Sequence, residues 1–154
     1  MARHSSACLS YHLELLNVKH NSMNMKDAEL ATARLLEVMD RLRKECPWDR
    51  EQTFDTLRNN TIEETYELVD AITDKNMEGI KEELGDLLLH VVFYSKMGDE
   101  AGAFNYADVA NGVCDKLIYR HPHVYGDIHA DTPEEVKQNW ELLKLRKKQR
   151  KSGA

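Results

Sequence analysis

The chain has 154 residues, the length of one ordinary domain, and at this size folding buries roughly 70% of the surface of the extended chain. Apolar residues make up 42% and charged residues 31%, with seven Gly and three Pro, which excludes collagen-like, low-complexity and wholly disordered proteins. The formal net charge is -6, which argues against a surface built throughout to bind nucleic acid. We therefore predict a globular protein without a nucleic-acid partner.

The cysteines and the apolar segments bear on where the protein resides. The three cysteines form no Cys-x-x-Cys pair and have an odd total, which favours neither a zinc site nor a disulfide framework. The longest apolar stretch, Leu87 to Tyr94, contains His90 and is far shorter than the ~20 residues that span a bilayer. No apolar segment typical of an export signal precedes Cys8. The sequence therefore predicts an unexported, cytoplasmic protein with no membrane partner.

Helical periodicity runs along most of the chain, and no segment alternates like a β-strand. A first helix is predicted at about 28–44, and its apolar stripe consists of Leu35, Val38, Met39 and Leu42. Pro47 ends this helix, because the residue before a proline is disfavoured in the helical conformation. A loop follows, with a short helical turn expected at about 53–57. The sequence thus predicts an all-α fold.

The second and third helices are predicted to form an antiparallel hairpin. Thr61 followed by Glu64 matches a capping box that opens the second helix, which is expected to end near Thr73. Asn76 is the predicted cap of the third helix, and Gly98 its predicted stop. The apolar face of the second helix is expected to consist of Ile62, Tyr66, Val69 and Ile72.

A fourth and a fifth helix complete the predicted fold. The fourth is expected to begin near Asn105 and to end at His121-Pro122, and Thr132 with Glu135 forms a capping box that opens the fifth. The residues that the fourth helix is expected to carry inward are Val109, Val113 and Leu117.

The two ends of the chain differ in composition from its middle. Residues 1–24 are rich in Asn, Ser and His and lack a strong helix cap, which predicts a loosely ordered leader. Six of the eight residues from Lys144 to Lys151 are basic, and such runs are usually solvated. We therefore expect a helical domain over 25–147 and a basic, disordered tail over 148–154.

Acidic residues occur in pairs on the two helices of the predicted hairpin. Glu64 and Glu67 lie three residues apart on one helix, and Glu83 and Asp86 have the same spacing on the other. Four carboxylates that meet across the hairpin raise one another's pKa unless a cation holds them, and oxygen ligands select a hard cation such as Mg²⁺. The alternative is that Glu64 only caps its helix beside Thr61 and that Glu82 and Glu83 are ordinary solvated helix residues.

His90 follows Asp86 by one helical turn and shares its face. It is either a partner of the acidic pairs or a histidine of the apolar core, and the sequence leaves both readings open. Neither helix carries the Glu-x-x-His motif that a di-iron carboxylate site requires, which argues against that class of metal site.

Basic and aromatic residues could bind a nucleotide. Lys116 and Arg120 share one face of the fourth helix, where they can grip a polyphosphate. Trp140 and Lys144 repeat this spacing on the fifth helix, and Trp48 lies in the loop after a proline. The alternative for the basic residues is that they form an ordinary exposed face. The alternative for Trp140 is packing in the core, and for Trp48 it is a structural role.

An ordered series of motifs covers some two thirds of the chain, from Leu35 to Lys144. The motifs are Cys46-Pro47-Trp48-Asp49 with Gln52-Thr53, Glu63-Glu64-x-x-Glu67, Glu82-Glu83-Leu84-Gly85-Asp86, Lys116-Leu117-x-x-Arg120-His121-Pro122-His123-Val124-Tyr125-Gly126 and Asn139-Trp140-Glu141. Together they resemble those of the MazG nucleoside triphosphate pyrophosphohydrolases. Residues 1–24 lie outside the resemblance.

The resemblance implies a MazG-like helical bundle in which Glu64, Glu67, Glu83 and Asp86 hold Mg²⁺, with Mn²⁺ as a substitute. The implied reaction cleaves a nucleoside triphosphate to the monophosphate and pyrophosphate, with Glu63, Glu64 and Glu67 as the catalytic acids. Similar proteins assemble as homodimers or higher homo-oligomers that complete the bundle, and long members of the family carry two such domains. A catalytically silent helical module that binds nucleotides or dimerises is the alternative function.

Overall fold

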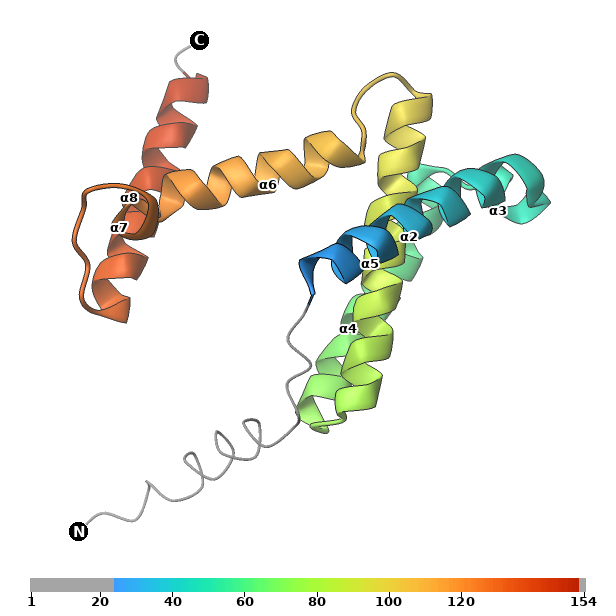
Figure 1. Ribbon diagram of the computed structural model, residues 1–154, viewed down its shortest axis with the longest axis horizontal. Helices are drawn as coiled ribbons and strands as arrows, with labels where there is room; N and C mark the ends of the chain where they lie inside the picture. Colours follow the sequence, from blue (N-terminus) through green and yellow to red (C-terminus); the bar gives the residue numbers. More distant parts are fainter. Residues whose placement is uncertain (1–23, 153–154) are drawn as a thin grey trace. The chain divides into compact units, whose positions relative to one another are not determined.

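The computed structural model describes the backbone of residues 24–152 and the side chains of residues 24–146. Its elements are α2 (Met25–Glu45), α3 (Pro47–Glu51), α4 (Phe54–Thr73), α5 (Met77–Glu100), α6 (Tyr106–Arg120), α7 (Pro122–Tyr125) and α8 (Pro133–Ser152) (Figure 1). All the regular structure in this described part is helical, which confirms the predicted fold class. Most of the predicted leader lies outside the described residues.

The chain divides into two compact units, the first ending at Glu51 and the second beginning at Gln52. The first unit contains α2 and α3. Cys46 joins them in an extended conformation (φ -88°, ψ 121°), as expected for a residue before a proline. The Arg43 guanidinium ties the two helices together by donating hydrogen bonds to the backbone carbonyls of Asp49 and Arg50. The short helix α3 occupies a segment that the sequence predicts to be loop.

The start of α4 differs from the predicted one. Thr53 caps the helix, since it accepts from the backbone N–H of Thr56 while Thr56 Oγ1 accepts from the Thr53 N–H. Thr61 instead lies within α4 and donates to the Leu57 carbonyl at 3.1 Å. The predicted capping box at Thr61 and Glu64 is therefore wrong. The helix already begins after the cap at Thr53, and no helix-breaking residue lies between Thr53 and Thr61. Glu64 is thereby left without a capping role.

α4 and α5 pack side by side and are joined by a turn of only three residues, so they run in opposite directions (Figure 1). Lys75 takes a left-handed conformation in this turn (φ 54°), and Asn76 caps α5 by accepting from the N–H of Gly79 at 3.1 Å. The two helices are also linked by a 2.6 Å hydrogen bond between the hydroxyls of Thr61 and Tyr94. The hairpin therefore holds α4 and α5 in a fixed register.

The C-terminal half of α5 is the most buried part of the second unit, and its buried residues are His90, Val92, Phe93, Ser95, Met97 and Gly98. Tyr94 stacks on Phe54 of α4, with ring centroids 5.7 Å apart. Gly98 does not stop the helix as predicted, since α5 continues to Glu100. A Cβ on Gly98 would come within 2.6 Å of the Phe104 ring, so glycine is needed here for packing. The turn after α5 instead uses Gly102, which has a positive φ of 66°.

α6, α7 and α8 follow, and α6 contacts both α7 and α8. Asn105 and Asp108 cap α6 reciprocally, and α6 ends at Arg120, as predicted. The predicted box at Thr132 also forms, because the Glu135 carboxylate accepts from the Thr132 N–H at 3.2 Å and the Thr132 hydroxyl accepts from the Glu135 N–H at 3.3 Å. The backbone of α8 is helical to Ser152, past the point where the sequence predicts a disordered tail to begin. Lys and Arg are good helix formers and are favoured near a helix C-terminus, which accounts for the difference.

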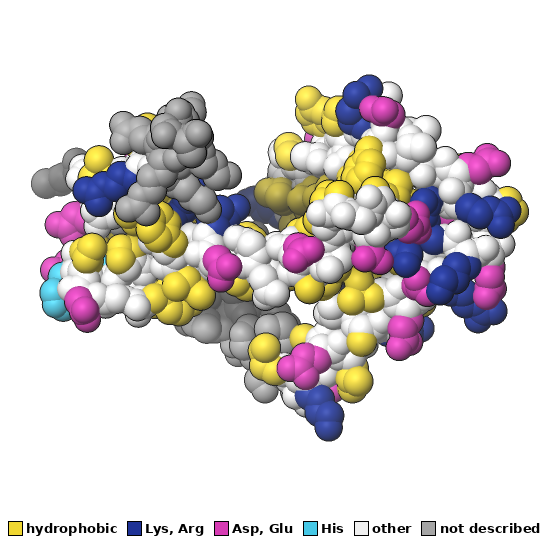
Figure 2. All heavy atoms as spheres, turned by 90° about the horizontal axis from the view of Figure 1, so that it is seen from above, with side chains coloured by type: hydrophobic (Ala, Val, Ile, Leu, Met, Phe, Trp, Pro, Cys, Tyr) yellow, Lys and Arg dark blue, Asp and Glu magenta, His cyan; other side chains and the backbone are white. Residues whose placement is uncertain are grey.

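The apolar faces of the helices are largely exposed. Only five hydrophobic side chains are buried among the described residues: Met39, Leu57, Val92, Phe93 and Met97. The exposed set, called here the apolar flank, consists of Ile62, Tyr66, Val69 and Ile72 on α4 and Met77, Leu84, Leu88 and Val91 on α5. Figure 2 shows hydrophobic side chains reaching the surface on this view of the molecule.

The expectation that α6 carries Val109, Val113 and Leu117 inward is wrong for the single chain, since all three are exposed. Sequence periodicity identifies an apolar face but does not say what packs against it. In the part of the chain that is described, no helix combines the length and the apolar character needed to cross a membrane.

Candidate metal centre

Three carboxylates meet where α4 packs against α5. Glu64 projects from α4, and Glu83 and Asp86 project from α5 one turn apart. One carboxylate oxygen from each lies within 4.8 Å of those of the other two, and all three side chains are half-buried. The structure therefore brings together three of the four acids that the sequence paired. The antiparallel packing of the two helices is what places them on one side of the hairpin.

Glu67, the fourth predicted ligand, lies outside this group of three and is exposed. It nevertheless acts on the group electrostatically, because its charge raises the pKa of both Glu64 and Glu83. Glu63 is also exposed and raises the pKa of Glu64. The two residues thus border the cluster, and neither has an oxygen in the close group.

The electrostatics of the cluster are those of like charges held together. The pKa of Glu64 lies above its ordinary value of 4.5, first because of desolvation and then because of the charges on Asp86, Glu67 and Glu63; a hydrogen bond with Glu83 opposes the rise. Desolvation and the charges on Glu67 and Glu64 likewise raise the pKa of Glu83. Without a cation the ionised cluster therefore opposes folding.

These residues fit a divalent cation. The donor set consists of carboxylate oxygens alone, which hard cations such as Mg²⁺, Mn²⁺ and Ca²⁺ prefer over softer metals. A bound cation would offset the repulsion between these carboxylates. The cluster is therefore a candidate metal centre, with Glu64, Glu83 and Asp86 as the residues that could hold the ion.

His90 lies one turn after Asp86 on α5 and is buried, with 7% of its surface exposed. Its Nδ1 has no hydrogen-bond partner among residues 24–146. Desolvation lowers the pKa of His90 below 6.5, and the negative charge of Asp86 acts in the opposite direction. Its ring makes an edge-to-face contact with Tyr94, with centroids 6.3 Å apart.

Two of the predicted nucleotide-binding residues, Arg120 and Trp140, meet where α6 contacts α8. The Arg120 guanidinium lies 4.8 Å from the centroid of the Trp140 ring, and the His121 ring packs against the same indole at 5.1 Å. Lys116 lies one turn before Arg120 and is half-buried. Lys144 pairs with Glu141 at 3.7 Å. Arg120, Trp140 and their neighbours thus form a second cluster, distinct in its contacts from the three carboxylates.

Trp48 belongs to the first unit, where it is 59% exposed on α3. Its predicted contact with a nucleotide base stays a prediction, as do the roles of Lys116, Arg120, Trp140 and Lys144 in substrate binding. Arg120 adds one observation to them, because its Nε is buried and has no hydrogen-bond partner in the described part of the chain.

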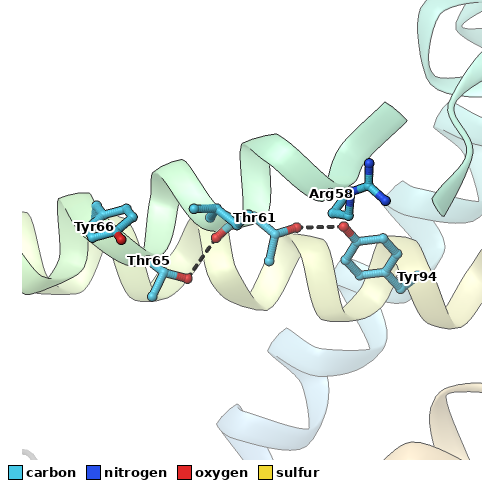
Figure 3. A pocket seen from close by; sticks show the side chains of 6 residues that line it. Arg58, Thr61, Thr65, Tyr66 and Tyr94 are labelled. Atoms are coloured by element: carbon cyan, nitrogen blue, oxygen red, sulfur yellow. Dashed lines mark hydrogen bonds between the residues drawn. The ribbon is translucent and has the colours of Figure 1, made fainter. Parts of the chain in front are cut away.

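A pocket that the sequence did not predict lies on the α4–α5 hairpin (Figure 3). It has a volume of about 390 Å³ and is lined by Arg58, Thr61, Ile62, Thr65, Tyr66 and Tyr94. Ile62 and Tyr66 belong to the apolar flank, so the pocket is continuous with that exposed surface. No motif marks it, because all its lining residues except Tyr94 are ordinary surface residues of α4, and Tyr94 reaches it only through the packing of α5.

The sequence is similar to a known family model and to known proteins. Residues 52–125 match the family model described as the MazG nucleotide pyrophosphohydrolase domain. A protein of Escherichia coli (strain K12) named nucleoside triphosphate pyrophosphohydrolase is 46% identical over 122 residues, which cover 77% of this chain and 46% of that protein. A Thermotoga maritima protein named nucleoside triphosphate pyrophosphohydrolase/pyrophosphatase MazG is 43% identical over 132 residues, covering 84% of this chain and 50% of that one.

The chain spans about half the length of these curated relatives. The fold is also similar to that of a solved structure, the crystal structure of a mazG-related protein from Thermotoga maritima. The TM-score is 0.63 at 23% sequence identity, and the match covers 73% of this chain and 97% of that one. The solved structure supports the all-α architecture described above.

The raised pKa of Glu83 predicts how stability depends on pH in the absence of a divalent cation. A carboxyl whose pKa is higher in the folded state than its ordinary 4.5 binds more protons folded than unfolded above that pH, so stability falls as the pH rises through the raised pKa. Glu83→Gln removes this titrating group, and its amide can still donate a hydrogen bond to Glu64. We expect the variant to lose less stability than the parent between pH 4.5 and neutral pH, and to melt no lower at neutral pH.

Urea unfolding in EDTA, at fixed protein concentration and a series of pH values, measures the effect. Glu37→Gln is the matched control, because Glu37 is exposed on α2 and its charge is not one that acts on the cluster. Parallel pH profiles for Glu83→Gln, Glu37→Gln and the parent would contradict the convergence of the carboxylates.

Proposed function

We propose that this chain, which belongs to the MazG family, hydrolyses nucleoside triphosphates to the monophosphate and pyrophosphate with the help of Mg²⁺. The observation that supports the proposal best is the approach of Glu64, Glu83 and Asp86 to within 4.8 Å of one another at the contact between two helices. Carboxylates kept together at an electrostatic cost are typical of a functional site. The names of the relatives supply the reaction class.

In this proposal Glu64, Glu83 and Asp86 hold the cation, and Glu67 completes the set of ligands from its place one turn after Glu64. Mn²⁺ is expected to substitute for Mg²⁺, because both accept carboxylate oxygens. A cation bound there supplies an activated water and polarises the phosphate oxygens. Glu63, which is exposed beside Glu64, is the residue proposed to accept a proton.

The cations of α6 are proposed to bind the polyphosphate. Arg120 is held by its contact with the Trp140 ring, which fixes the plane of the guanidinium while its Nε has no partner among the described residues. An oriented guanidinium loses less conformational entropy when it binds a phosphate in a bidentate manner. Lys116 adds a second charge one turn away, and Lys144, Trp140 and Trp48 are the further residues proposed to contact the nucleotide.

We also propose that the chain works as a homodimer or a higher homo-oligomer. The apolar flank runs along both α4 and α5, whereas surfaces of soluble monomers rarely present apolar patches of this extent. A second copy has the same flank and could cover it around a two-fold axis. Cys46 and Cys114 are free thiols, which suits the reducing environment of the cytoplasm, where we place the protein.

The first prediction from this proposal concerns the products. Phosphorus NMR of a nucleoside triphosphate incubated with the protein and Mg²⁺ should show monophosphate and pyrophosphate. Asp86→Asn should lower the rate more than about 100-fold, since even outer-sphere partners of a metal cost 10–100-fold. Asp70→Asn, at an exposed position on α4 outside the cluster, should leave the rate unchanged. Diphosphate and orthophosphate as first products would overturn the reaction, and nucleotide binding without turnover would favour a silent module.

The second prediction concerns substrate binding. Lys116→Gln should weaken nucleotide affinity by roughly 1.5–3 kcal/mol, the range for hydrogen bonds to charged groups, while the melting temperature stays the same. Lys116 is the cleaner choice, because changing Arg120 also removes its contact with Trp140. Lys81→Gln, on exposed α5 surface beside Glu78, is the control. Calorimetry with a non-hydrolysable triphosphate measures the affinity, and an unaltered value for Lys116→Gln would return this residue to an ordinary surface role.

The third prediction concerns assembly. Light scattering coupled to gel filtration should give the parent at least twice the mass of one chain. The double variant Val69→Lys with Leu88→Lys places two charges on the apolar flank and should shift the protein toward the monomer. Asp70→Lys, next to Val69 but outside the flank, should keep the parent's mass. A monomeric parent would contradict the proposed oligomer.

A further inference from the structure

The surroundings of His90 leave one of its polar atoms unexplained. His90 is 7% exposed, and its buried Nδ1 has no hydrogen-bond partner among residues 24–146. A buried polar atom without a partner opposes folding, so such atoms are few in native proteins and often belong to functional sites. The core reading of His90 does not account for it, because a core histidine is expected to be hydrogen-bonded.

His121 of the same chain, the residue that follows the end of α6, shows one way in which a histidine satisfies this atom. Its Nδ1 lies 2.6 Å from the carbonyl oxygen of Leu117, one turn earlier on α6. The equivalent residue for His90 is Asp86, and no such bond forms to it. His121, which follows the last residue of α6, therefore has a partner for its Nδ1, whereas His90, inside α5, has none among the described residues.

Packing holds the His90 ring in this orientation. Its edge-to-face contact with Tyr94, at 6.3 Å and an interplanar angle of 64°, fixes one side of the imidazole. Tyr94 is itself fixed by its hydrogen bond to Thr61 at 2.6 Å and by stacking on Phe54, with rings 5° from parallel. The imidazole therefore has an unused hydrogen-bonding atom one turn from Asp86.

Asp86 has a complementary need. Glu64 and Glu83 share a hydrogen bond, but in the described part of the chain no group donates a hydrogen bond to the Asp86 side chain. Carboxylates that bind metal ions are as a rule hydrogen-bonded in turn by neighbouring residues, which fix their orientation. His90 is near enough to feel the Asp86 charge and lies on the same helix face.

We propose that His90 is a positioning residue of the carboxylate site, which donates a hydrogen bond to the Asp86 carboxylate and so sets its orientation toward a bound divalent cation. The inference rests on the proposed metal-dependent function. His90 acts through Asp86 and touches neither the nucleotide nor the ion.

Metal binding without nucleotide tests the proposal, with the full chain and Mn²⁺ followed by electron paramagnetic resonance. His90→Phe keeps an aromatic ring of similar size but cannot hydrogen-bond, and it should weaken Mn²⁺ binding ten- to a hundredfold. His90→Asn retains a polar nitrogen near the position of Nδ1 and should keep most of the parent's affinity. Val92→Ala is the control, because Val92 is on the same helix and 1% exposed; it should lower the melting temperature and leave Mn²⁺ affinity unchanged.

The outcomes separate this inference from the function on which it rests. Mn²⁺ binding by His90→Phe equal to that of the parent overturns the positioning role and leaves the metal site standing. Equal losses in His90→Phe and His90→Asn overturn the hydrogen bond, since the polar replacement would then bring no rescue. A parent that binds no Mn²⁺ overturns the proposed metal site, and with it the role of His90.

Discussion

Close packing of α4 against α5 is the constraint on which the rest of the second unit depends. The turn between them has only three residues, so the helices run antiparallel and in contact. The Thr61–Tyr94 hydrogen bond fixes their register. That register presses Glu64 against Glu83 and Asp86 on one side of the hairpin. The same packing that buries Leu57 and Phe93 thus stores electrostatic repulsion in the carboxylate cluster, and the apolar contacts must outweigh it.

The two clusters of the second unit offer different chemical groups to the proposed reaction. The carboxylates supply hard oxygen ligands, while the junction of α6, α7 and α8 supplies a guanidinium held on an indole ring. Neither arrangement is explained by stability alone, because the first holds like charges together and the second contains the Arg120 Nε, which has no partner in the described part of the chain. A polyphosphate with a divalent cation is a ligand that carries the complementary groups for both.

The sequence predicted the elements with local signals best. Asn76, Asn105 and Thr132 cap the helices that they were expected to cap, since capping depends only on nearby backbone and side chains. The box at Thr61 failed because an earlier cap allowed the helix to begin upstream. The pairing of the acids on each helix followed from helical spacing. Tertiary packing, which residue spacing does not encode, determines three other features: the absence of Glu67 from the close group, the Arg120–Trp140 contact and the pocket beside Tyr94.

The short turn after α4 also governs which changes in chain length the hairpin can absorb. Each residue of an α-helix advances the side chains by about 100° around its axis. A residue added inside α5, between the cap at Asn76 and Glu83, would rotate every later side chain of α5 relative to α4 or force a bulge in the helix. A residue added at Lys75, which already takes a turn conformation, leaves the angular phase of both helices intact. An insertion at the turn is therefore compatible with the carboxylate cluster, whereas an insertion a few residues later, inside α5, is not.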